Sequence, residues 1–129
     1  MAVDCHIHMA LDGGYWKDAL ARHKEAPDEQ FIRKTLETYK SLGFTYLRDG
    51  GDRWDAGKRA SELAPKYGIR YRTPIFPIYR KGHYGSFIGR GFETLDDFRA
   101  LISEVKVRGG HFIKIMISGL MDFNRYGVL

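Results

Sequence analysis

The sequence lacks the features of secreted and membrane proteins. Its 129 residues contain a single cysteine, Cys5, so no intramolecular disulfide can form and a secreted disulfide scaffold is excluded. No run approaches the roughly 18 apolar residues of a membrane span. No basic segment leads into an apolar run of signal-peptide length either. We therefore expect a cytoplasmic protein with no membrane association.

The composition is that of one folded domain. Hydrophobic residues make up 43% and charged residues 29%, which excludes disorder and low complexity. Lysine and arginine number 21 against 16 acidic residues, a net charge of +5. This surplus permits an anionic ligand but is too small to indicate nucleic-acid binding by itself.

The hydrophobic pattern alternates between strand and helix periodicity. Strands are expected at 2–9, 44–47, 69–79 and 112–118, and helices at 28–42, 56–67 and 95–109, with a long glycine-rich loop at 81–92. Proline interrupts two of these elements, because Pro65 lies in the second helix and Pro74 and Pro77 in the third strand. The order β-α-β-α-β-α-β predicts an α/β fold with parallel strands joined by right-handed crossovers.

The first strand carries a pair of histidines at alternate positions. Side chains alternate along a strand, so Asp4, His6 and His8 are expected on one face and the apolar residues between them on the other. Two imidazoles at this spacing can chelate a divalent metal such as zinc. They could instead be hydrogen-bonded interior residues. Their position at the end of a first parallel strand, just before a glycine-rich loop, favours the metal site.

The fourth strand is apolar except for one lysine. If its isoleucines pack against helices, Lys114 points to the opposite side, toward the histidine pair. A buried lysine tends to be neutral, and a neutral amine can act as a base, form a Schiff base or react with carbon dioxide to form a carbamate. The alternative is a lysine that extends to water or pairs with Asp4 or Asp49.

Three segments of the chain together resemble a known family. In order and spacing, the segments 3–8 (VDCHIH), 43–51 (GFTYLRDGG) and 112–116 (FIKIM) resemble the first half of the metal-dependent amidohydrolase superfamily. The resemblance implies a partial TIM barrel, about strands 1–4 of eight. It assigns His6 and His8 to the first metal, expected to be Zn²⁺, and Lys114 to a carboxylated, metal-bridging role. Asp4 and Asp49 are at most supporting residues.

The resemblance stops before the family's later catalytic groups. In that family the remaining metal histidines and the catalytic aspartate lie on later strands, beyond Leu129. We therefore expect residues 1–129 to be a single N-terminal half-barrel domain, a fragment of a longer amidohydrolase. In that parent, a metal-activated water would attack an amide or ester-like bond of a small-molecule substrate. No catalytic residue is assigned within the fragment, which is expected to be inactive alone.

Loop residues at the same edge of the strands are candidates for a substrate pocket. They are Tyr15 and Trp16 after the first strand, and His83 and Arg90, with Tyr84 and Phe87 between them, in the glycine-rich loop. Ordinary loop residues explain them better, because loop position alone carries little weight.

Two other classes of function remain open. Segment 68–92 has five basic residues, no acid and several aromatic residues, a mixture found in single-strand nucleic-acid and phosphate binders. A solvated basic face with core aromatic residues explains it better, because no nucleic-acid-binding motif accompanies it. Alternatively, an open half-barrel leaves uncovered sheet edges and would self-associate as a homo-oligomer.

Overall fold

Two small parallel sheets form the framework of the protein. The computed structural model describes residues 2–118, 121–122 and 127–128. The first sheet has the order β1-β2-β3, formed by β1 (Ala2–Ile7), β2 (Phe44–Asp49) and β3 (Arg70–Arg72). The second has the order β5-β4-β6, formed by β4 (Ile78–Arg80), β5 (Arg90–Phe92) and β6 (Ile115–Met116). Strands β7 (Met121–Asp122) and β8 (Gly127–Val128) form an antiparallel pair.

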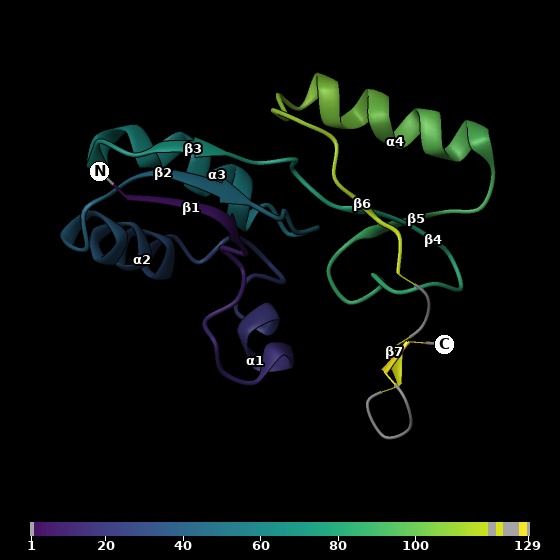
Figure 1. Cartoon of the computed structure of the whole chain (residues 1–129), viewed down its shortest axis with the longest axis horizontal. Coiled ribbons are helices and arrows are strands. Elements are labelled where there is room, and N and C mark those ends of the chain that lie inside the picture. Colours follow the sequence, from purple (N-terminus) through teal and green to yellow (C-terminus); the bar gives the residue numbers. More distant parts are fainter. Residues whose placement is uncertain (1, 119–120, 123–126, 129) are drawn as a thin grey trace.

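Helices separate the parallel strands along the chain. They are α1 (Trp16–Ala21), α2 (Glu29–Ser41), α3 (Ala56–Leu63), the 3₁₀ turn η1 (Ala64–Tyr67) and α4 (Leu95–Val107). Helices α2 and α3 lie beside the first sheet, and α4 runs along the second (Figure 1). The predicted α/β class with parallel strands is confirmed, whereas α1 was expected to be loop. None of the described helices is long and apolar enough to cross a membrane.

Local signals set the ends of the helices. Asp28 caps α2 by accepting a hydrogen bond from the Phe31 amide at 3.0 Å. Thr94 and Asp97 form a reciprocal capping box at the start of α4. Helix α3 ends at Leu63, and Pro65 lies in the 3₁₀ turn that follows, because a proline cannot continue the α-helical hydrogen bonds.

The third predicted strand is divided where its prolines lie. Residues 73–77 separate β3 from β4, and Ile75 adopts a positive φ of 67° there. The segment that leads into β6 forms backbone hydrogen bonds next to both β3 and β4. The His111 amide donates to the Thr73 carbonyl, and the Ile78 amide donates to the Lys114 carbonyl, each at 2.9 Å. Backbone hydrogen bonds therefore carry the pairing from the edge of the first sheet into the second.

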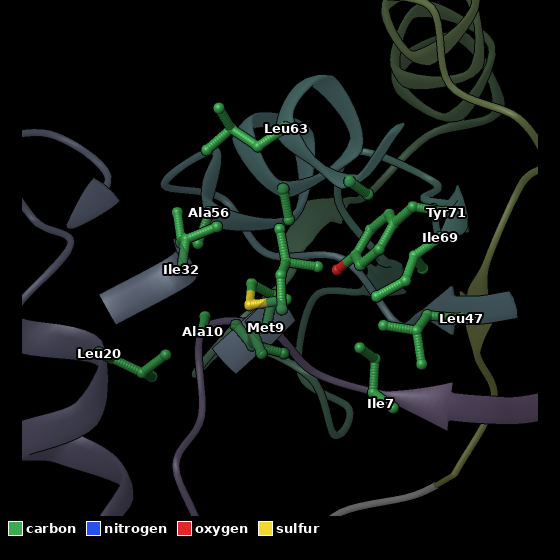
Figure 2. Close-up of a cluster of buried hydrophobic side chains, with 14 residues drawn as sticks. Ile7, Met9, Ala10, Leu20, Ile32, Leu47, Ala56, Leu63, Ile69 and Tyr71 are labelled. Carbon is green, nitrogen blue, oxygen red and sulfur yellow. The ribbon is translucent and has the colours of Figure 1, made fainter. Parts of the chain in front are cut away.

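Two apolar clusters form the core. The larger lies between the first sheet, α2 and α3 and includes Leu36 and Leu47; Figure 2 shows most of its side chains. The smaller consists of Ile75, Phe76, Ile78, Leu101 and Val105 beneath α4. Segment 81–92, predicted to be a long mobile loop, contains β5 and contributes the fully buried Ile88 to the larger cluster.

The predicted alternation of faces along the first strand is wrong. Asp4 pairs with Leu47 and Ile7 with Asp49, so three steps along β1 match two along β2. The Asp4 carboxylate accepts a hydrogen bond from the His6 amide at 3.1 Å within this bulge. Because side chains alternate, the extra residue places Asp4 and Ile7 on one face of the sheet. The strict alternation expected for Asp4, His6 and His8 is therefore interrupted at this bulge.

The predicted burial of the fourth strand is reversed. Regular strand covers only Ile115–Met116 instead of 112–118. Ile113, Ile115 and Ile117 are 37%, 46% and 90% exposed, so they do not pack against helices. The intervening residues are more covered, and Met116 packs against the larger core cluster. Lys114 lies on this inner side.

Candidate metal site

The lysine near the end of the chain meets the first histidine of β1. The Nζ atom of Lys114 lies 2.8 Å from the Nε2 atom of His6, a hydrogen bond between residues 108 positions apart. An ammonium and an imidazolium both only donate, so at least one of these two groups is neutral in this contact. Both side chains line a hollow of about 300 Å³, with Cys5, Arg48 and Phe112 among its other walls.

The imidazoles of His6 on β1 and of His8 just after it are spaced as a pair of metal ligands. Their ring centroids are 5.3 Å apart and the rings are tilted by 52°. A tetrahedral zinc ion bound at about 2.1 Å by one nitrogen of each ring would hold the two centroids about 5.2 Å apart. The observed distance between the ring centroids of His6 and His8 therefore matches that of two imidazoles bound to one ion.

His8 is held in a fixed orientation by two glycines. Its Nδ1 atom lies 3.2 Å from the Gly51 carbonyl oxygen, which gives Nδ1 the proton and leaves Nε2 free to bind a ligand. Metal-binding histidines commonly donate their second N–H to a carbonyl in this way. The ring also packs closely on Gly50, where a Cβ atom would lie 2.2 Å from the His8 Cε1. Only glycine at position 50 therefore leaves room for this ring.

The electrostatics of the site favour neutral nitrogen donors. Burial, followed by the charge of Lys114, lowers the pKa of His8 to about 4, so its imidazole is neutral at pH 7. Burial also lowers the pKa of Lys114, although the Asp49 carboxyl partly opposes this. Metal ligands must be deprotonated, and carbamate formation requires a neutral amine, so both shifts suit the proposed chemistry.

Asp49 lies beneath the site and is held by hydrogen bonds. It is 2% exposed and accepts from the Met9 amide at 3.2 Å and the Thr73 hydroxyl at 2.9 Å. Burial, together with the charge of Asp52, raises its pKa to about 7. The Asp52 carboxylate accepts from backbone amides at the start of α3. Asp49 thus ties the end of β1 to Thr73, a supporting partner that the sequence did not indicate.

Asp4 lines a hollow together with His6 and His8, but its carboxylate is engaged by other partners. Besides accepting from the His6 amide, its carboxylate accepts a weak 3.5 Å hydrogen bond from the Tyr39 hydroxyl on α2. Across the part of the chain that the structure describes, no group of three His, Cys, Asp or Glu side chains is placed to hold a metal. The donors at hand are the two imidazoles, and Lys114 adds oxygen ligands only once it is carboxylated.

The four pocket candidates from the loops do not come together. Trp16 lines a cavity beside His8, and Tyr15 lies next to it with ring centroids 6.3 Å apart. Arg90 instead forms an ion pair with Glu104 of α4. His83 lines a separate hollow with Arg80 and residues of β6.

Two rings of the basic aromatic segment 68–92 lie in the core and are not available for stacking on bases. Tyr71 and Phe76 are 5% and 0% exposed, because they belong to the two core clusters. Lys81 pairs with Glu93, and Arg90 with Glu104. These contacts match the interpretation of this segment as core aromatic residues with a solvated basic face.

Compared with protein-family models, curated proteins and solved structures, the chain has no significant match.

Proposed function

We propose that this chain forms the first four strands of a TIM-barrel hydrolase of the amidohydrolase type. The proposal depends chiefly on the contact between Lys114 and His6, because two segments 108 residues apart bring an amine and an imidazole within 2.8 Å. These are the residue types, on the first and fourth barrel strands, that the resemblance assigns to the metal centre. The parallel pairing β1-β2-β3 and β4-β6 is compatible with this strand order.

In this proposal His6 and His8 hold a divalent metal, with Lys114 as a carbamate providing a further ligand. The donor set fits zinc, since the histidine spacing and the neutral His8 imidazole both suit that ion. The chemistry that the bound metal supplies is activation of water for hydrolysis of an amide or ester-like bond.

The chain's own residues orient the donors. The Gly51 carbonyl fixes the tautomer of His8, and Gly50 lets the ring lie flat against the backbone. The hydrogen bond between the Lys114 Nζ and the His6 Nε2 atoms orients the His6 ring. Because the catalytic acid of the resembled family lies on a later strand, these residues bind and position but are not expected to turn over substrate unaided.

Zinc titration of the purified chain tests the metal site. We expect His6→Asn and His8→Asn each to weaken zinc binding by at least about tenfold, since each removes one of few ligands. The matched control is His83→Asn, an exposed histidine in a separate hollow, which should bind zinc like the parent. Equal zinc affinity in all four proteins would contradict the proposal.

Labelling with ¹³C-bicarbonate tests the role of Lys114. In the presence of zinc, a carbamate carbon signal is expected in the NMR spectrum of the parent chain and should disappear in Lys114→Arg. Lys106→Arg, at an exposed lysine of α4, is the control and should retain the signal. A signal that survives Lys114→Arg would remove this lysine from the site.

The uncovered isoleucine face supports self-association as a second candidate property. Ile113, Ile115 and Ile117 are exposed beside β6, and Val3 on β1 is 52% exposed. Exposed apolar side chains on short strands favour pairing with another copy. Light scattering should show a homo-oligomer that Ile117→Glu weakens, and a strict monomer at high concentration would count against this.

A further inference from the structure

A second cavity adjoins the candidate metal site on the other side of His8. It has a volume of about 470 Å³ and is lined by His8, Leu11, Trp16, Tyr84 and Phe87. Small-molecule sites in proteins have volumes of about 300–1,000 Å³ and are mostly apolar and aromatic with few polar groups. This cavity fits that description, and one of its walls is a proposed metal ligand.

The aromatic walls come from two distant segments and contact one another. Trp16 on α1 meets Phe87 edge to face, with centroids 5.8 Å apart and planes at 72°. Tyr84 lies 5.3 Å from Phe87 at 49°. The Lys17 Nζ atom lies 5.5 Å from the Trp16 ring centroid, and a further planar group would pack against the three rings edge to face or with an offset stack. Trp16 remains 42% exposed, so the rings are not simply buried in the core.

The loop that carries two of these rings has a defined shape. The Gly85 carbonyl accepts from the amides of Ile88 and Gly89, and the buried Ile88 anchors the turn in the core. Gly85 has a φ of 136°, and a Cβ atom there would lie 2.7 Å from the Tyr79 Cβ. A glycine is therefore required at this position, and the turn holds Tyr84 and Phe87 on the same side as Trp16.

Among the residues that the structure describes, no side chain lining the cavity is an acid, a lysine or an arginine. A charged group would lose its hydration there without gaining an ion-pair partner. The polar groups available are the His8 imidazole, the Tyr84 hydroxyl and the indole N–H of Trp16. The chemistry of the walls thus selects a planar, uncharged group.

From this arrangement we infer that the cavity binds an uncharged aromatic ring, which makes the substrate class an aromatic amide or ester. Assigning that ring to a substrate rests on the proposed function, whereas binding of the ring itself does not. With the ring between Trp16, Tyr84 and Phe87, the attached carbonyl group lies at the His8 end, beside the proposed metal ligands.

Benzamide titration followed by NMR of the two tryptophan indole N–H groups tests the inference. Trp16 lines the cavity, whereas Trp54 is not among its lining residues and contacts Arg53, so Trp54 serves as an internal control. We expect saturable shifts of the Trp16 signal alone, with a dissociation constant on the order of millimolar for so small a ligand. Unsaturable or equal shifts of both indoles would overturn the inference.

Variants and related ligands test the aromatic specificity. Phe87→Leu should weaken benzamide binding by about three- to tenfold, the loss expected for one ring contact. Phe98→Leu is the matched control and should not change benzamide binding. It removes a ring on α4 whose centroid lies 5.0 Å from that of Phe92. Tyr84→Leu provides a second test if Phe87→Leu does not fold. Cyclohexanecarboxamide and benzoate should each bind at least about threefold more weakly, and equal binding of either would refute the planar or uncharged requirement.

Measuring benzamide binding with a chelator present separates this inference from the proposed function. Benzamide binding without any zinc site at His6 and His8 would leave the cavity assignment standing and remove the hydrolase. Zinc binding at His6 and His8 without benzamide binding would leave the proposed metal site standing and remove the aromatic cavity assignment.

Discussion

Replacing Asp49 by asparagine should change how the stability of the protein depends on pH. The carboxyl group is 2% exposed, and its pKa is raised from 3.8 to about 7 by burial and by the charge of Asp52. Asparagine is nearly isosteric. Its carbonyl can accept from the Met9 amide, and its NH₂ group can donate to the Thr73 hydroxyl, so the contacts of Asp49 can be replaced.

The sign of the effect follows from proton linkage. The folded protein binds the Asp49 proton more tightly than the unfolded chain does, so the stabilisation is fully present below pH 3.8 and is lost as the pH rises through about 7. At about 1.4 kcal/mol per pKa unit, the rise from 3.8 to about 7 is worth at most about 4 kcal/mol. The free energy of unfolding of Asp49→Asn minus that of the parent should therefore increase by up to this amount between about pH 4 and pH 8.

His8 opposes this trend in the parent chain. Its pKa is lowered from 6.5 to about 4, so its contribution to stability is present above pH 6.5 and is lost as the pH falls through about 4. The two groups thus have opposite slopes over much of the same pH range, and the parent curve should be comparatively flat. Asp49→Asn should reveal the rising slope of His8, and His8→Asn the falling slope of Asp49.

Urea unfolding followed by circular dichroism, with a chelator present, measures these differences. Asp96→Asn is the control, because that carboxylate side chain is 90% exposed, and its difference from the parent should not vary with pH. A difference between Asp49→Asn and the parent that stays constant within about 1 kcal/mol across the range would refute the buried, proton-binding role assigned to Asp49.

Three further substitutions test the packing. Gly50→Ala places a Cβ atom 2.2 Å from the His8 ring, so zinc affinity should fall at least about tenfold. Overpacking should also lower the free energy of unfolding by about 1–3 kcal/mol, and unchanged zinc titration and urea curves would contradict this. Tyr71→Phe removes a buried hydroxyl that has no hydrogen-bond partner within the described ranges, so urea unfolding should show a gain of about 1 kcal/mol, and a loss would mean that the hydroxyl is satisfied. Leu36→Ala, at a fully buried position, should cost about 2–5 kcal/mol in the same assay, whereas Leu42→Ala, at a 65% exposed position, should cost far less; equal costs would be incompatible with the core described.

Short-range signals explain the success of the secondary-structure predictions. The cap at Asp28, the capping box at Thr94 and the stop at Pro65 each involve residues only a few positions apart, so the sequence carries them directly. The same holds for the His6-x-His8 spacing. Where the predictions were wrong, the cause was not local. The bulge between Asp4 and Ile7 depends on the register with β2, and a shift of one residue reverses which face a side chain occupies.

By itself the sequence determined the α/β class, the order of the parallel elements and the residue types available for a metal site. The sequence also indicated that Lys114 faces the histidine pair, but only the tertiary structure decided its 2.8 Å contact with His6 and the exposure of the isoleucines beside it. The tertiary structure also decided that Trp16 joins Tyr84 and Phe87 around a cavity next to His8. The reason is physical: periodicity and capping depend on neighbours within a turn or two, whereas the meeting of distant side chains depends on how whole sheets and helices pack.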